Sequence, residues 1–279
     1  MSKIYFNRLH LTVPENTNKR IFYIDGIKSA AAAAYKDYAY KIIDVESKDD
    51  FIMGKLVKYD PYGRGEFLDE KDGKVKKGGT VNTVVAKSIF IIQVSESVIA
   101  FKEIPNILSK MMFNRMFKEL FNINNKGKLF DFSMTSITEQ YSFVDKVATL
   151  KNINKVVISL VPSNPRNADI WKDMDERLRN NNITKYKEVQ ETFRPGGITI
   201  DEETKSKMYM SEDGYGESFA SGTDDLGNKV TITTKQHNKE VFTELPHEIE
   251  NKGDFKSIIN FLIGTFDKIS ERTKKAWEE

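Results

Sequence analysis

The chain has 279 residues, no cysteine and only three histidines. Disulfides, cysteine metal sites and thiol nucleophiles are therefore excluded. Its 43 Lys and Arg residues nearly balance 41 Asp and Glu residues, so a nucleic acid would have to be held by a local basic patch rather than by the field of the whole protein. No apolar run approaches the roughly 20 residues that cross a bilayer, and no leader sequence is recognisable, so we expect a cytoplasmic protein without a membrane partner.

Patterning along the chain predicts an α+β protein with two sheet-bearing lobes and mainly antiparallel strands. We place the boundary in the break at 122–127, which gives a β-rich lobe over residues 1–125 and an α+β lobe over residues 126–279. A long helix should begin after Asp254 and close the second lobe, because apolar residues recur behind it at helical spacing.

Several segments of the first lobe show the alternation and the β-branched residues of strands. They are 4–13, 20–24, 40–45, 51–59, 88–94 and 98–101. The segment 88–94 is apolar on both faces, which predicts a position at the centre of a sheet. We expect one helix from Ser29 through the alanine run to Tyr38, a second from Pro105 to about 121, and an exposed loop over 60–80.

The second lobe is expected to alternate strands with helices. The predicted strands are 130–137, 155–161, an edge strand at 184–193 and a meander over 213–245. The predicted helices are 139–150, a segment from an N-cap at Asn167 to about Arg179, and the closing helix after Asp254.

A basic segment beside aromatic residues suggests a nucleic-acid partner. Cations on a loop close to Tyr59, Tyr62 and Phe67 suit a phosphate backbone with stacked bases. Acidic residues interrupt the segment, so a solvated hairpin tip is the alternative. The candidate nucleic-acid-binding residues are Arg64, Lys74, Lys76, Lys77, Arg115 and Lys118.

A second candidate site contains Asp44, Glu46 and Lys48, which stand at the end of a predicted strand in the Asp/Glu-x-Lys order of restriction-type nucleases. In such a site carboxylates hold Mg²⁺ and the lysine orients or activates the water. Asp25 or Asp37 could supply a further carboxylate. A charged β-turn explains the same residues, and without this nuclease site we expect no cofactor.

His10 and Thr12 have the His-x-Thr form that two-histidine phosphoesterases use twice, with one imidazole as base and the other as acid. A second copy is required, and neither His237 nor His247 is followed by a hydroxyl residue two positions on. We therefore expect His10 to be an ordinary strand histidine.

The most distinctive local sequence is 211–227, whose Gly-Tyr-Gly and Gly-Thr-Asp-Asp-Leu-Gly segments predict short strands joined by tight turns. Together with the strand 156–161 that runs into Pro162-Ser-Asn-Pro165, these segments make the chain resemble an uncharacterised prokaryotic protein family associated with mobile elements and anti-phage defence islands. The resemblance implies a biological setting and provides no catalytic residues.

Three functional hypotheses follow. The first is a cytoplasmic defence component that acts by binding nucleic acid or a phage protein. The second is a metal-dependent nuclease that uses Asp44, Glu46 and Lys48. The third is a structural subunit that docks on other subunits of a larger defence complex. Because no residues match a strong catalytic motif, the sequence leaves open whether the protein is an enzyme.

Overall fold

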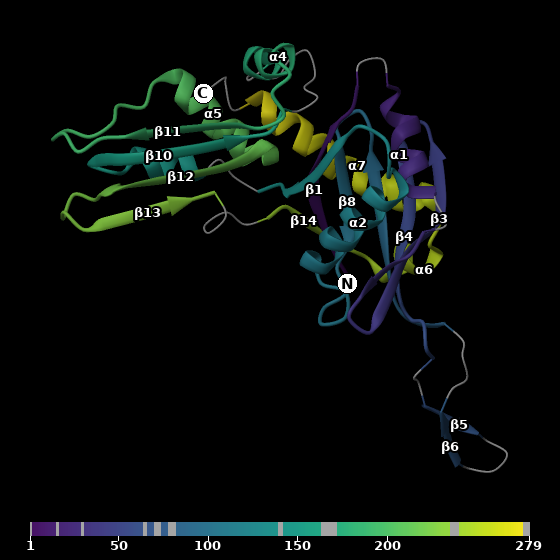
Figure 1. Ribbon diagram of the computed structural model, residues 1–279. Coiled ribbons are helices and arrows are strands. Elements are labelled where there is room, and N and C mark those ends of the chain that lie inside the picture. The colour runs from purple at the N-terminus through teal and green to yellow at the C-terminus, as the bar shows by residue number, and fades with distance from the viewer. Residues whose placement is uncertain are drawn as a thin grey trace.

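The structure is a computed structural model in which two antiparallel sheets lie side by side (Figure 1). Helices pack on both sheets, so the predicted α+β class is confirmed. The residues that it describes are 2–14, 17–28, 31–63, 66–69, 74–77, 82–138, 142–162, 172–234 and 240–275.

The first sheet has eight strands in the order β14-β1-β8-β7-β4-β3-β2, with β9 also paired to β1. Their bounds are β1 Ser2–Thr12, β2 Ala33–Tyr35, β3 Tyr38–Lys48, β4 Phe51–Asp60, β7 Thr83–Gln93, β8 Val98–Lys102, β9 Asp131–Ser136 and β14 Phe242–Leu245. Strand β7 lies between β4 and β8 in the interior of the sheet, as its two apolar faces predicted. Its hairpin with β8 is also confirmed.

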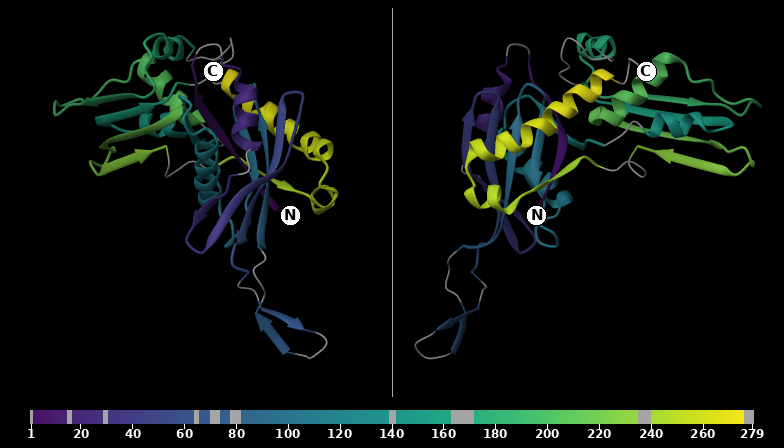
Figure 2. Two further views of the ribbon diagram at one scale, coloured as in Figure 1. Left: turned by 45° about the vertical axis from the view of Figure 1, so that its right-hand side comes forward. Right: turned by 180° about the vertical axis from the view of Figure 1, so that it is seen from behind.

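Both faces of the first sheet are covered by helices (Figure 2). On one face, α1 (Lys19–Lys28) and α2 (Lys110–Asn124) bury a phenylalanine-rich core. On the other, α7 (Phe255–Lys275) packs Leu262 and Phe266 against Ile4 and Phe6 of β1, and α6 (His247–Lys252) precedes it. Asp254 caps α7 as expected, because its Oδ1 accepts from the backbone of Ser257 at 2.8 Å.

The second sheet has the order β11-β10-β12-β13. Its strands are β10 Asn152–Leu160, β11 Tyr186–Glu191, β12 Gly216–Thr223 and β13 Lys229–Thr233. The accompanying helices are α3 (Ser142–Ala148), α4 (Lys172–Asn180) and α5 (Glu202–Met210). Side chains such as Phe143 of α3 and Met208 of α5 form a core with Val156 and Ile158 of β10.

The second sheet is inserted into the chain between β9 and β14 of the first. The two places where the chain passes between the sheets are adjacent. The backbone N–H of Val241 donates to the Ile137 carbonyl at 2.8 Å, and Thr138 forms a β-bridge with Glu240. Sheet membership therefore does not follow the division at residue 125. The expectation that the C-terminal helix closes the second lobe is wrong, since α7 packs on the first sheet.

Two further expectations for the first lobe are wrong. The segment 20–24 is part of α1, because Asn18 Oδ1 accepts from the Ile21 backbone and a helix lets Phe22 and Ile27 face the core together. The end of the alanine run lies in β2 rather than in a helix, since alanine is small enough for either element and a tight hairpin with β3 pairs Ala33 with Tyr40. The expected helix start, Ser29, lies outside the described residues.

Smaller differences concern the ends of elements and missed elements. Helix α2 begins at Lys110 rather than at Pro105, because Ser109 accepts from the Met112 backbone as its N-cap. The expected loop over 60–80 contains a hairpin of β5 (Glu66–Asp69) and β6 (Lys74–Lys77). Helix α5 was not predicted at all. The proposed N-cap Asn167 lies outside the described residues.

Candidate nucleic-acid interface

One end of the first sheet gathers aromatic and basic residues. Strand β3 starts and β4 ends there, as the pairing of Tyr40 with Lys58 shows, and the pairing of Asp60 with Thr83 places the start of β7 at the same end. The β2–β3 turn and the β5–β6 hairpin both project from this end (Figures 1 and 2). Helix α2 packs beside β2. We call the group formed by Tyr35, Lys36, Tyr38, Lys58 and Arg115 the aromatic–basic surface.

Cations lie over the tyrosine rings of this surface. The Cζ atom of Arg115 is 4.1 Å from the ring centroid of Tyr35, and the Nζ atom of Lys58 is 4.0 Å from that of Tyr38. Lys36 lies 5.7 Å from the Tyr35 ring. Such pairs are held by attraction between the positive charge and the negative face of the ring. The surface therefore offers positive charge and flat aromatic groups side by side.

A cavity of about 490 Å³ opens between the β2–β3 hairpin and the start of α2. Lys58, one of its lining residues, donates a hydrogen bond to the Ile107 carbonyl at 3.0 Å. Partial burial lowers the pKa of Lys58. The lining residues are Tyr35, Lys36, Tyr38, Tyr40, Lys58, Glu103, Pro105, Asn106, Ile107, Ser109 and Met112.

Two acidic residues limit where an anion could sit. Glu103 lines the cavity and accepts from the backbone of Lys110 at 3.2 Å, so its carboxylate occupies the N-terminus of α2. Asp37 stands in the β2–β3 turn. Away from the start of α2, the exposed cations of the surface are Arg115 and Lys36, and Lys36 is next to Asp37 in the same turn.

The structure places the predicted basic residues on two elements. Arg115 and Lys118 are exposed on α2, and their three-residue spacing puts them on one face. The residues Lys74, Lys76 and Lys77 are on β6, where the register sets Lys74 opposite Asp69 and Lys77 opposite Glu66. Arg64 lies outside the described residues.

Sequence reasoning missed the aromatic part of this surface. Its signal is the run Tyr35-Lys-Asp-Tyr38, in which two tyrosines flank a charged turn. The predicted helix over the alanine run hid that signal, because it did not reveal the hairpin in which Tyr35 of β2 pairs with Tyr38 of β3.

The nuclease candidates are not brought together around a common point. Asp44 lies at an irregularity of the β3–β4 ladder with a φ of 52°, and its Oδ2 is 2.8 Å from Lys55 Nζ. Glu46 and Lys48 are exposed further along β3. Asp25, a possible further ligand, pairs with Lys128. Among the described residues, no group of three His, Asp or Glu side chains could hold a metal ion.

A second polar cluster lies buried where the two sheets meet. It is made by β1 and by the helical turn Ser211–Tyr215 that leads into β12. Arg8 Nη2 donates to Asp213 Oδ2 at 2.6 Å, and the Arg8 guanidinium lies 4.7 Å from the Tyr215 ring. The Glu212 carboxylate accepts from the Phe143 backbone at 2.7 Å, which fixes the start of α3. This junction cluster ties the second lobe to β1 of the first sheet.

His10 belongs to the junction cluster and is 4% exposed. Its Nε2 lies 2.7 Å from the Gly214 carbonyl, which can only accept, so this nitrogen carries the hydrogen. Burial lowers the pKa of His10 to about 4, so the imidazole is neutral at neutral pH. A neutral, enclosed ring fits the expected structural role.

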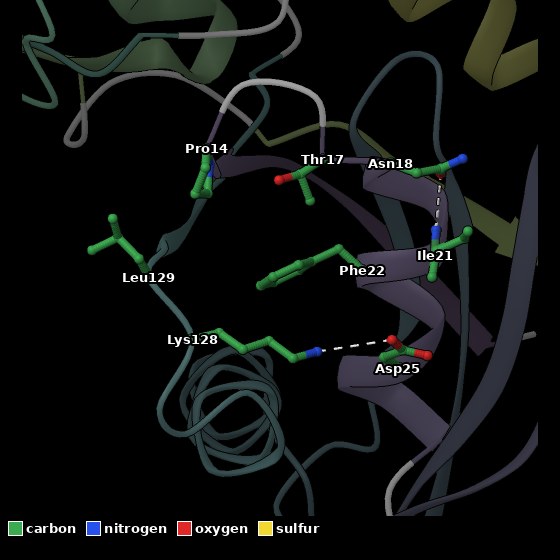
Figure 3. A pocket seen from close by; sticks show the side chains of 8 residues that line it. All are labelled: Pro14, Thr17, Asn18, Ile21, Phe22, Asp25, Lys128 and Leu129. Atoms are coloured by element: carbon green, nitrogen blue, oxygen red, sulfur yellow. Dashed lines mark hydrogen bonds and ion pairs between the residues drawn. The ribbon is translucent and has the colours of Figure 1, made fainter.

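A third feature is a hollow of about 470 Å³ beside α1. Figure 3 shows Phe22 pointing into it from the helix, with Lys128 and Asp25 paired at 3.8 Å along one side. The remaining lining residues are Pro14, Thr17, Asn18, Ile21 and Leu129. The hollow is mostly apolar and offers few groups that would orient a ligand.

Comparison with known proteins identifies the family. The family described as domain of unknown function (DUF4747) matches residues 2–263. The chain belongs to this family. The match runs from β1 into α7, so it includes both sheets, the aromatic–basic surface and the junction cluster. No curated protein matches this DUF4747 chain. Within its described residues, none of the helices has the length and apolar character needed to cross a membrane.

Proposed function

We propose that this protein binds nucleic acid through the aromatic–basic surface, as a cytoplasmic component of prokaryotic anti-phage defence. The observation that carries the proposal is the pairing of Arg115 with Tyr35 and of Lys58 with Tyr38 at one end of the first sheet. Phosphates are bound by cations, and bases stack on aromatic rings and on guanidinium planes. The defence setting rests on the family resemblance of the sequence.

Charge distribution supports the choice of this end of the sheet. The formal net charge of the chain is only +2, so attraction of a polyanion has to be local. Lys36, Arg115 and Lys118 add exposed positive charge around the tyrosines, and the β5–β6 hairpin with its three lysines projects from the same end.

Fluorescence anisotropy with labelled oligonucleotides at low salt tests the proposal. Unmodified protein should bind, and its affinity should fall steeply as salt is added because condensed counterions are released. Arg115→Gln should weaken binding and lower the slope of the salt dependence by about one. Lys155→Gln is the matched control, since Lys155 is an exposed lysine of the second sheet. Absence of binding at low salt, or equal loss in both variants, would contradict the proposal.

The same samples test the alternative of a nuclease. Oligonucleotides incubated with the protein and Mg²⁺ or Mn²⁺ should stay intact if the protein only binds. Cleavage that a chelator stops and that Asp44→Asn abolishes would favour the Asp44, Glu46 and Lys48 hypothesis instead. A phage protein or another defence subunit as the partner stays a prediction from the sequence.

A further inference from the structure

We infer that the ligand is a single strand whose unpaired bases stack against the Tyr35–Arg115 and Tyr38–Lys58 pairs, an inference that rests on the proposed function. In each pair a cation covers one face of the ring within 4.1 Å of its centroid, so a base would stack on the other face of the ring or, at Arg115, on the guanidinium plane. A phosphate backbone alone would need only the cations. The rings add binding energy only when a base is free to lie against them.

The cavity favours an unpaired base over a duplex. Its walls come from the β2–β3 hairpin and from the 103–109 segment, so the tyrosines line a recess rather than a flat face. In a duplex the base faces are already stacked, and exposing one costs a few kcal/mol. Ile107, which lines the recess and is 41% exposed, provides an apolar contact there.

The charges around the recess determine the path of the phosphate backbone of the bound strand. Glu103 repels phosphates from the side of the recess at the start of α2. On the other side, Arg115 and Lys118 follow one another along the exposed face of α2. The strand should therefore run along that helix face, with its phosphates toward the cations and its bases toward Tyr35 and Tyr38.

Four probes separate the contribution of the bases from that of the backbone. They are 15-nucleotide single strands of DNA and of RNA, a blunt-ended duplex of two separate strands, and an abasic strand of the same length and charge. The single strands should bind at least tenfold more tightly than the duplex and the abasic strand. The DNA and RNA strands show which sugar the surface accepts.

Substitutions then assign the effect to the rings. Tyr35→Leu and Tyr38→Leu should each weaken single-strand binding about tenfold and leave binding of the abasic strand unchanged. Tyr35→Phe keeps an aromatic ring and should bind the single strands as tightly as the unmodified protein does. Arg115→Gln should weaken both. Phe193→Leu is the control, because this aromatic residue is 93% exposed on the second lobe. Circular dichroism and melting temperatures confirm that each variant is folded.

The outcomes distinguish the two proposals. If no probe binds, the proposed function fails. If all four probes bind equally and only Arg115→Gln matters, nucleic-acid binding survives and base stacking is overturned. If the single strands bind best but both leucine variants bind them like the unmodified protein, the bases stack elsewhere and the inference is again overturned.

Discussion

Arg8 and Asp213 are 205 residues apart in the chain, yet they form an ion pair 2.6 Å long whose side chains are 3% and 0% exposed. Arg8 also donates to the Glu96 and Asp213 carbonyls, so three of its nitrogens have acceptors. Burial of charge is tolerated only where such partners are in place. This pair fixes the helical turn of the second lobe on β1 of the first sheet.

Removing one partner of this pair should destabilise the protein strongly. Arg8→Met leaves the buried Asp213 carboxylate without its cation, and we expect the free energy of unfolding to fall by about 3–5 kcal/mol. Urea denaturation followed by circular dichroism measures this loss. Lys155→Gln breaks an exposed pair with Glu191 and should cost less than about 1 kcal/mol. Equal effects of the two substitutions would show that burial of the pair is unimportant.

The buried imidazole of His10 should make stability depend on pH. Its pKa is lowered to about 4 in the folded protein and is about 6.5 in the unfolded chain, so the unfolded chain takes up the proton first as pH falls. The contribution of His10 is fully present above pH 6.5 and is lost as pH falls toward 4. At pH 4.5 the loss should reach about 2–3 kcal/mol. Urea titrations between pH 7 and 4.5 should show a smaller decline for His10→Gln than for the unmodified protein.

Alanine substitutions at three glycines distinguish the effect of backbone strain on stability from the effect of side-chain packing. Gly214 has a φ of 89°, and an added Cβ would lie 3.1 Å from the Cβ of Arg8. Gly227 has a φ of 81° with nothing within 4 Å, and Gly264 lies inside α7 with open space around it.

We expect Gly214→Ala to destabilise more than Gly227→Ala, which should cost about 1–2 kcal/mol through strain alone. Gly264→Ala should instead stabilise by about 0.5–1 kcal/mol, because alanine favours the helix. Melting temperatures of the three variants check this order. If the Gly214→Ala variant were as stable as the Gly227→Ala variant, the residues around Gly214 would have to accommodate the added methyl group without loss of stability.

The C-terminal helix should be essential for the first sheet. Phe266 of α7 is buried edge-on to Phe6 with ring centroids 5.4 Å apart, so Phe266→Ala should cost about 3–5 kcal/mol. Ile263→Ala, at a position of the same helix that is 42% exposed, should cost far less. Urea unfolding of both variants measures the difference. Similar values would indicate that α7 is only loosely attached.

The sequence correctly predicted those helices and strands whose residues favour the same secondary structure that tertiary packing requires. The hairpin around Ser95-Glu-Ser97 and the strand 155–161 are rich in β-branched residues, which predict strands. Asp254 is a favourable N-cap residue, which predicts the start of α7. The segment 20–24 failed because β-branched and aromatic residues suit a strand, whereas packing of Phe22 against α2 requires a helix.

Long-range contacts explain what the sequence could not predict about the two sites. Nothing near Arg8 in the chain indicates its partner, because Asp213 lies in a different lobe. The sequence predicted short strands joined by tight turns over 211–227, and only the packed structure shows that Ser211–Tyr215 is a helical turn in which Glu212 and Asp213 are buried. At the nucleic-acid interface, Arg115 was predicted, but its contact with Tyr35 depends on how α2 lies beside β2.

The insertion of the second sheet between β9 and β14 has a consequence for synthesis on the ribosome. Strand β1 is synthesised before the second lobe, whereas β14 and α7, which complete its sheet and cover it, are synthesised after that lobe. The inserted lobe, with its own core, can fold first, while Ile4 and Phe6 stay uncovered until α7 has been synthesised. Truncation before residue 242 should therefore leave the earlier half of the polypeptide prone to aggregation and dependent on chaperones.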